Sequence, residues 1–184
     1  MNEMATISYE QRPYSQTAQK ALARKPQLFI NNQWVDSTHE AVIEVEDPSS
    51  GKIVSHIADA SDADVDRAVA AARAAFDDAR WSGLPPMQRE RIINRLADLI
   101  DAHTEEFAEL EAIDNGKPKG MAGAIDVPGA TSQLRFMAGW ASKVSGETTQ
   151  PYNMPNGAVF SYTVKEPVGV CAQIVPWNFP LLMA

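Results

Sequence analysis

An almost uninterrupted apolar run near the carboxyl end, residues 168–175, constrains the fold of this 184-residue chain more than any other feature. Such a run is typical of a strand buried on both faces of a parallel sheet. Each parallel neighbour needs a crossover of a dozen or more residues. Nothing before Val168 supplies a comparable strand followed by a helix, and the sequence stops shortly after a turn at residues 176–180. We therefore expect the chain to be cut at the first βα unit of a larger α/β domain.

Short extended runs are expected ahead of the helices. Residues 1–26 show no clear apolar period and are expected to form a flexible tail, with at most a short helix around residues 15–24. The turn residues Asn31 and Asn32, between two β-prone runs, predict a hairpin. The expected strands are residues 28–30, 33–35, 41–46 and 52–58.

The middle of the chain is expected to be helical. Ser61 is a suitable N-cap for a first helix that ends at residues 81–83, and Thr104 for a third that ends at Asn115-Gly116. Pro128 would break a fourth, so that helix either kinks there or restarts with Asp126 as its cap. The first two helices should bury stripes at helical spacing: Val65, Ala68, Val69, Ala72 and Phe76, then Ile92, Ile93, Leu96, Leu99 and Ile100.

Composition excludes several classes of protein. With 16 basic and 24 acidic residues the formal net charge is −8, which argues against a nucleic-acid binder or a protein of anionic membranes. No apolar run approaches the ~20 residues of a membrane span. The first 19 residues do not form a secretory signal. We therefore expect a cytoplasmic protein without nucleic-acid or membrane partners.

Most residues that could carry chemistry are expected to be structural. The only cysteine, Cys171, lies within the apolar run and is expected to be buried and inert. His39, His56 and His103 do not have the spacing of a metal site or triad, so we expect surface positions and no metal. The turn at residues 114–117 could suggest phosphate binding, but a helix C-cap is favoured. The carboxylates at Glu105, Glu106, Glu109 and Glu111 are expected to form a solvated face.

Asn178 is the exception. It lies in a turn fixed by Pro176 and Pro180, directly after the predicted buried strand. Ligands of α/β sheets bind at the carboxyl ends of such strands. The amide can donate to an oxygen that develops negative charge, so a functional and a turn-stabilising role are equally plausible here. The glycine-rich dinucleotide fingerprint is absent after this strand.

Several motifs together resemble the aldehyde dehydrogenase superfamily over about residues 27–184. The most specific is EPVGVCAQIVPWNFPLLM at residues 166–183. DNGKP at residues 114–118 and FMAGW at residues 136–140 precede it in family order. Arg80-Trp81 and the opening of the first motif look nearest to the phenylacetaldehyde dehydrogenase branch.

The resemblance implies the amino-terminal part of an α/β fold. The implied divisions are a tail (1–26), amino-terminal strands with a helical layer (27–150), an oligomerisation arm (151–167), and an incomplete Rossmann-like sheet (168–184). The edge strand that we expect at residues 158–165 belongs to the arm. A homodimer or homotetramer is implied for the complete enzyme.

The resemblance also implies the oxidation of an aldehyde to a carboxylic acid with NAD, NADP not being excluded. Asn178 matches the oxyanion-stabilising asparagine. The positions that match the cofactor-binding segment are Ile174, Val175, Pro176 and Trp177. The positions that match the substrate tunnel are Gly129, Phe179, Leu182 and Met183, and the openness at Gly129 suggests arylalkyl aldehydes.

The same resemblance places the nucleophilic cysteine and the general-base glutamate beyond Ala184, and Cys171 does not match the nucleophile. These 184 residues alone are therefore expected to be inactive. The alternative hypothesis is a truncated, non-catalytic paralogue that acts as an interaction module.

Overall fold

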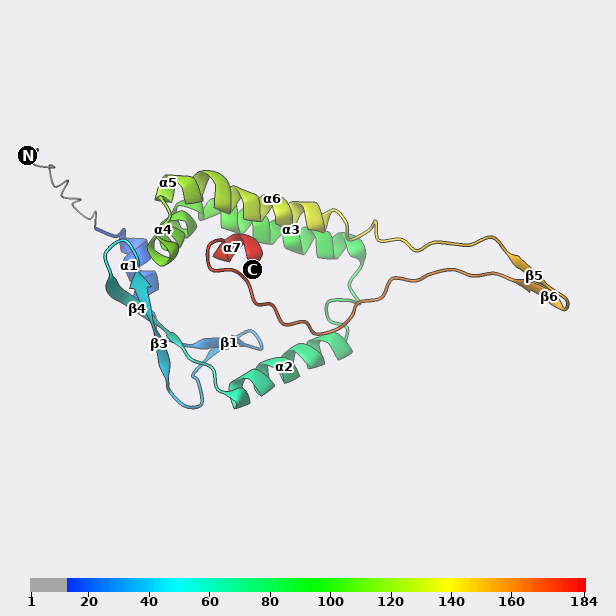
Figure 1. The fold of residues 1–184 in the computed structure, drawn as a ribbon, viewed down its shortest axis with the longest axis horizontal. Helices are drawn as coiled ribbons and strands as arrows, with labels where there is room; N and C mark the ends of the chain where they lie inside the picture. The colour runs from blue at the N-terminus through cyan, green and yellow to red at the C-terminus, as the bar shows by residue number, and fades with distance from the viewer. Residues whose placement is uncertain (1–12) are drawn as a thin grey trace, which may run out of the picture.

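The computed structural model describes residues 13–184, except the side chains of residues 152–154. Figure 1 shows an open arrangement of α-helices and short hairpins. The elements are α1 (Gln16–Leu22), β1 (Leu28–Ile30), β2 (Gln33–Val35), β3 (Val42–Asp47), β4 (Lys52–Ala58), α2 (Asp62–Asp77), α3 (Pro86–Ala102), α4 (Thr104–Asn115), α5 (Lys119–Met121), the π-helical turn η1 (Ala122–Asp126), α6 (Val127–Ala138), β5 (Tyr152–Met154), β6 (Gly157–Val159) and α7 (Pro180–Met183).

The predicted strands form antiparallel pairs. In the β1–β2 hairpin, Asn31 and Asn32 both have positive φ, 50° and 62°, as a two-residue turn of the I′ type requires. Strands β3 and β4 form a second pair, with a register shift at Val45/Glu46. The hairpin and these two strands are confirmed. The edge strand expected at residues 158–165 is largely wrong, because only β6 pairs, with β5, and one isolated bridge joins Thr148 to Tyr162.

The helix ends follow local chemistry at most positions. Ser61 caps α2 and forms a reciprocal capping box with Asp64, as predicted for the cap. The α2 helix ends at Asp77, earlier than expected. Gly116 terminates α4 with φ 77°, and a Cβ there would also approach Pro48 Cγ to 2.9 Å. Thr104 is not a cap, because its Oγ1 donates to the Asp101 carbonyl instead.

Of the two alternatives for Pro128, the restart with Asp126 as a cap is wrong. The helix continues through η1, where Val127 N–H donates to the Ala122 carbonyl five residues back. This wider turn accommodates a proline ring, which lacks an N–H and would clash with the carbonyl four residues before it. Asp126 has helical φ and ψ and makes no cap hydrogen bond.

The hydrophobic core lies where α3, α4, η1 and α6 meet. Its buried members are Ile100, Ala108, Ala122 and Val127, and Phe107, Leu134 and Leu181 pack against it. In Figure 1, α6 runs alongside α3 and α7 rests against this layer. The small side chains at Ala108 and Ala122 let the helices approach closely.

The segment around α1 is attached to this body. Tyr14 OH donates to Asp47 Oδ2 at 2.6 Å, and Ser15 N–H donates to Glu109 Oε1 at 2.7 Å. The short helix expected around residues 15–24 is confirmed by α1. Residues 1–12 of the expected tail lie outside the described residues.

Two expectations about burial are wrong for the chain as described. Val65, Ile92 and Leu96, from the expected stripes of α2 and α3, are exposed. Residues 168–175 form no strand, and Val168 is 91% exposed. In the α3 stripe only Ile100 is buried, where α3 meets α6. The described residues provide no parallel strand to pair with residues 168–175, and no layer that covers α2 and the exposed part of the α3 stripe.

Candidate active-site turn

The turn after the apolar segment is built by two prolines and a short helix. Trp177 and Asn178 form the turn, and Pro180 occupies the first position of α7, where a missing N–H costs nothing. Met183 N–H donates to the Phe179 carbonyl at 3.1 Å. Asn178 is exposed. Its side-chain amide therefore faces solvent, where a ligand can reach it.

Lys117 joins this turn to the helical layer. Its Nζ donates to the Asn178 backbone carbonyl at 2.9 Å and lies 4.1 Å from the centre of the Phe179 ring. The same ammonium forms ion pairs with Asp126 and, at 3.4 Å, with Glu111. The Lys117 side chain is only 15% exposed. The turn thus rests on a largely buried, charged anchor.

The charges of this anchor influence one another. Burial, and next the neighbouring Asp126 carboxylate, raise the pKa of Glu111. Burial lowers the pKa of Lys117, but Asp126 and Glu111 outweigh it, so the pKa of Lys117 is raised and its ammonium stays charged. Glu111 Oε2 has no hydrogen-bond partner among the described residues. The expectation that Glu111 belongs to a solvated face is wrong.

Two of the four predicted tunnel residues meet in the structure. A Cβ added to Gly129 on α6 would lie 3.5 Å from Leu182 Cδ1 on α7, an ordinary contact distance. The ring of Phe179 lies against Lys117. Met183 is partly exposed at the end of α7. The structure therefore brings Gly129 and Leu182 together, and places Phe179 and Met183 on the same short segment.

The predicted cofactor-binding residues lie in one extended run leading into the turn. Ile174 is fully exposed, and Val175 and Trp177 are also exposed. No helix or strand includes Ile174, Val175 or Pro176. The apolar side chains of Ile174, Val175 and Trp177 are thus accessible, and ligand sites are lined predominantly by such apolar and aromatic surface.

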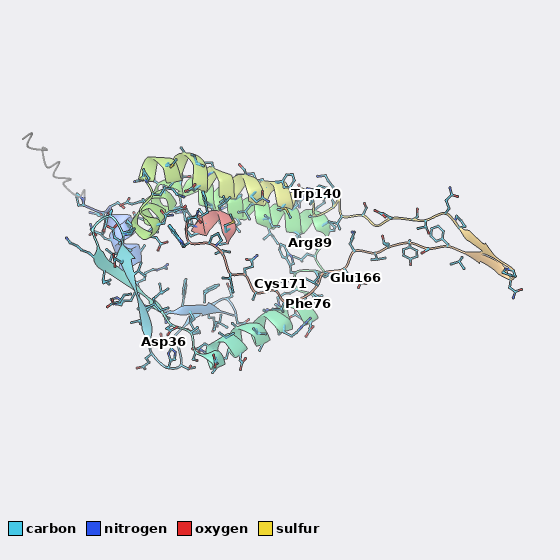
Figure 2. The ribbon with its side chains drawn as sticks, in the orientation of Figure 1. Asp36, Phe76, Arg89, Trp140, Glu166 and Cys171 are labelled. Atoms are coloured by element: carbon cyan, nitrogen blue, oxygen red, sulfur yellow. The ribbon has the colours of Figure 1, made fainter. Side chains whose placement is uncertain are left out.

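Cys171 lies on this segment and is exposed, so the expectation of a buried thiol is wrong. Its Sγ is 3.8 Å from the Gly169 carbonyl oxygen. In the view of Figure 2, Cys171 lies near Phe76, on the side of α2 that faces the α3–α6 layer. A Cβ on Gly169 would lie 3.5 Å from Arg73 Nη1, so the segment passes close to α2.

The remaining candidates carry no site in residues 13–184. His39, His56 and His103 are exposed, as predicted. The described residues contain no group of three or more His, Cys, Asp or Glu side chains suited to a metal ion. Within the same range, no helix has the length and apolarity needed to cross a membrane.

Comparison with known proteins decides the family. The sequence model of the aldehyde dehydrogenase family matches residues 34–184. This chain belongs to the aldehyde dehydrogenase family. The mitochondrial aldehyde dehydrogenase of Sus scrofa is 47% identical to this chain over 159 residues, which are 85% of the chain and 30% of that protein. The Homo sapiens mitochondrial enzyme is 45% identical over 158 residues, with the same coverage.

Solved structures show the same relationship. A variant of the Bacillus cereus aldehyde dehydrogenase matches with a TM-score of 0.86 and 36% identity, over 94% of this chain and 34% of that one. The NAD⁺ complex of the Bacillus cereus enzyme matches with a TM-score of 0.85 and 36% identity, over 93% and 34%. The fold is thus the amino-terminal part of the aldehyde dehydrogenase fold, as predicted. The chain spans about a third of the length of these relatives.

Lys117 is the residue that sequence reasoning missed. It follows the Asn115-Gly116 helix end and was expected to belong to a plain C-cap turn. The sequence predicts a solvated carboxylate for its partner Glu111, and for Asp126 a helix cap as one of the two alternatives at Pro128. Helical spacing offers one signal, because Glu111 lies three residues after the small apolar Ala108 and shares its face of α4, and both are buried.

Proposed function

We propose that this chain supplies the oxyanion-stabilising turn and part of the cofactor-binding surface of an enzyme that oxidises an aldehyde to a carboxylic acid with NAD or NADP. Family membership and the likeness to the NAD⁺ complex of the Bacillus cereus enzyme support this. The observation that carries the proposal is the anchored turn, in which the Asn178 backbone is held by Lys117 while its side chain remains exposed.

The chemistry assigned to this chain is charge stabilisation. When a nucleophile adds to the carbonyl carbon of the aldehyde, the carbonyl oxygen becomes negatively charged. The side-chain amide of Asn178 donates a hydrogen bond to this oxygen. Residues 174–177 would hold the dinucleotide through backbone groups and the apolar surface of Ile174 and Val175. A bound nicotinamide supplies the hydride-accepting group.

The 184 residues by themselves are proposed to be inactive. Cys171 is the only thiol in the sequence, and it does not match the family's nucleophile. NADH formation by the purified 184-residue chain, if abolished by Cys171→Ser, would contradict this. Catalysis is therefore tested in an enzyme that carries these residues together with the nucleophile.

In that enzyme, Asn178→Ala should lower kcat by about 10²-fold or more, the effect of losing one oxyanion donor. Binding of NAD should be unchanged, because the donor acts only as charge develops. Steady-state kinetics and NAD titration give the two readouts. Gln88→Ala, which removes an exposed side-chain amide on α3, outside the turn and the proposed assembly arm, is the matched control. A near-normal kcat for Asn178→Ala would remove Asn178 from the mechanism.

We further propose that the substrate is a bulky, arylalkyl aldehyde. Gly129 has no side chain, and its neighbour Leu182 and the ring of Phe179 offer apolar surface. An aromatic ring buries more apolar area than a methyl group, at about 25 cal/mol per Å². A wide passage also positions a two-carbon substrate poorly.

Gly129→Met should therefore lower kcat/KM for phenylacetaldehyde relative to acetaldehyde. The effect should be confined to this glycine, so Gly120→Met, at a glycine with open space around it, is the control. The substrate proposal would be contradicted if Gly129→Met left the ratio of kcat/KM for phenylacetaldehyde to that for acetaldehyde unchanged. It would also be contradicted if the unsubstituted enzyme preferred acetaldehyde.

We also propose that residues 151–167 mediate assembly into a homodimer or homotetramer. The β5–β6 hairpin extends away from the body in Figure 1. Phe160 and Tyr162 are exposed in the segment that follows β6, with ring centres 6.1 Å apart. Exposed aromatic pairs of this kind favour association with another chain.

A further inference from the structure

We propose that Lys117 is a positioning residue for Asn178, because its ammonium fixes the backbone of the turn from which the Asn178 amide projects. This inference rests on the proposed function, in which Asn178 stabilises the oxyanion. The contact that carries it is the 2.9 Å hydrogen bond from Lys117 Nζ to the Asn178 carbonyl, between residues 61 positions apart.

The donors of the ammonium are fully used. A lysine ammonium has three N–H donors and no acceptor. Lys117 Nζ has three oxygen partners, in Asp126, Glu111 and Asn178. The ring of Phe179 lies against the same ammonium, a cation–π arrangement. The position of Nζ is thus defined from several directions, and two of its contacts are with consecutive residues of the turn.

The carboxylates make the anchor rigid. The side chains of Glu111 and Asp126 are 3% and 2% exposed and belong to α4 and η1, which pack together. The lysine therefore transmits the position of the packed helical layer to an exposed turn. The turn needs such support, because residues 164–176, which lead into it, form no helix or strand that could hold it in place. An oxyanion donor must be held to within about 0.5 Å to act well.

The variants separate this role from simple structural support. Lys117→Met removes the donor but leaves two buried carboxylates unpaired, so it can destabilise the whole chain. The compensated variant Lys117→Met/Glu111→Gln/Asp126→Asn removes the donor together with both charges. Lys119→Met is the matched control, because Lys119 pairs with Glu105 and Glu109 and makes no contact with the turn.

The first measurement is hydrogen exchange of the 184-residue chain, followed by mass spectrometry. The compensated variant should exchange the amides of residues 177–184 about tenfold faster, which corresponds to the loss of one hydrogen bond to a charged group. Exchange in α3 and α6 should be unchanged, and Lys119→Met should match the parent throughout. Unchanged exchange of residues 177–184 in a folded compensated variant would overturn the inference, whatever the activity.

The second measurement is a kinetic double-mutant cycle in the enzyme that carries these residues. The compensated variant should lower kcat about tenfold or more without raising KM for the aldehyde, and it should have no further effect in the Asn178→Ala background. Additive losses would overturn the inference, since Lys117 would then act independently of Asn178. If instead Asn178→Ala alone left kcat unchanged, the proposed function would fail, while the exchange result would still report on the anchor.

Discussion

At the scale of single residues, the carboxylate of Asp47 ties the amino-terminal segment to the body. It is almost fully buried and accepts hydrogen bonds from Tyr14 OH, Ser49 N–H and Ser49 Oγ. Burial by itself would raise its pKa. The hydrogen bonds from Ser49 and Tyr14 outweigh burial and lower the pKa from 3.8 to about 2.

Asp47→Asn should therefore lower the free energy of unfolding at pH 7 by about 1–2 kcal/mol. A lowered folded-state pKa gives stability that is fully present above the ordinary value of 3.8 and is lost as the pH falls towards about 2. The difference between parent and variant should shrink over that window. Urea unfolding at several pH values measures it, with the exposed neighbour Glu46→Gln as control. A difference that does not depend on pH would contradict the assignment.

Residue roles were predictable from the sequence only where they depend on neighbours in the chain. The hairpin turn at Asn31 and the helix end at Gly116 follow from turn and cap chemistry, and both were predicted; both residues have positive φ. Asn178 was singled out because two prolines fix its turn. The role of Lys117 was not predictable, because its partners lie 6, 9 and 61 residues away and meet only through helix packing.

At the scale of elements, only one of the two predicted N-cap residues, Ser61, caps its helix, whereas Thr104 does not. Ser61 Oγ accepts from Asp64 N–H, and the Asp64 carboxylate accepts from Ser61 N–H at 3.0 Å. Ser61→Ala should therefore destabilise the chain by about 1 kcal/mol. Thr104→Ala, which removes a hydroxyl that binds only the Asp101 carbonyl, should cost less. Thermal or urea unfolding of both variants tests this, and equal effects would contradict the assignment of the caps.

Helix existence was predictable from sequence, whereas helix continuity was not. The rule that a proline breaks a helix assumes an α-helical turn around it, and η1 avoids the clash by widening that turn before Pro128. Nothing in the local sequence distinguishes this solution from a kink or a restart. The structure favours it because Asp126 points to Lys117 on the neighbouring segment instead of capping its own helix.

At the scale of the whole molecule, the family fold was predictable but burial was not. The apolar stripe of α2 and the run at residues 168–175 have the composition of buried surfaces. Burial depends on what covers a surface, which periodicity does not specify. Figure 1 shows α2 standing apart from the α3–α6 layer, with the segment that leads to α7 crossing between them. Apolar faces of both sides thus remain in contact with solvent.

This arrangement predicts a difference in local stability within the 184-residue chain. Residues 164–176 form no helix or strand and contain the exposed side chains of Val164, Val168 and Ile174, so local opening there costs little. Brief digestion with a nonspecific protease should cut residues 164–176 well before α3 or α6, and an apolar dye should bind the exposed faces. The compact layer around Ile100 and Val127 provides the internal control, because it is buried. Equal protection of both regions, together with no dye binding, would mean that these apolar surfaces are covered in solution, most simply by association between copies of the chain.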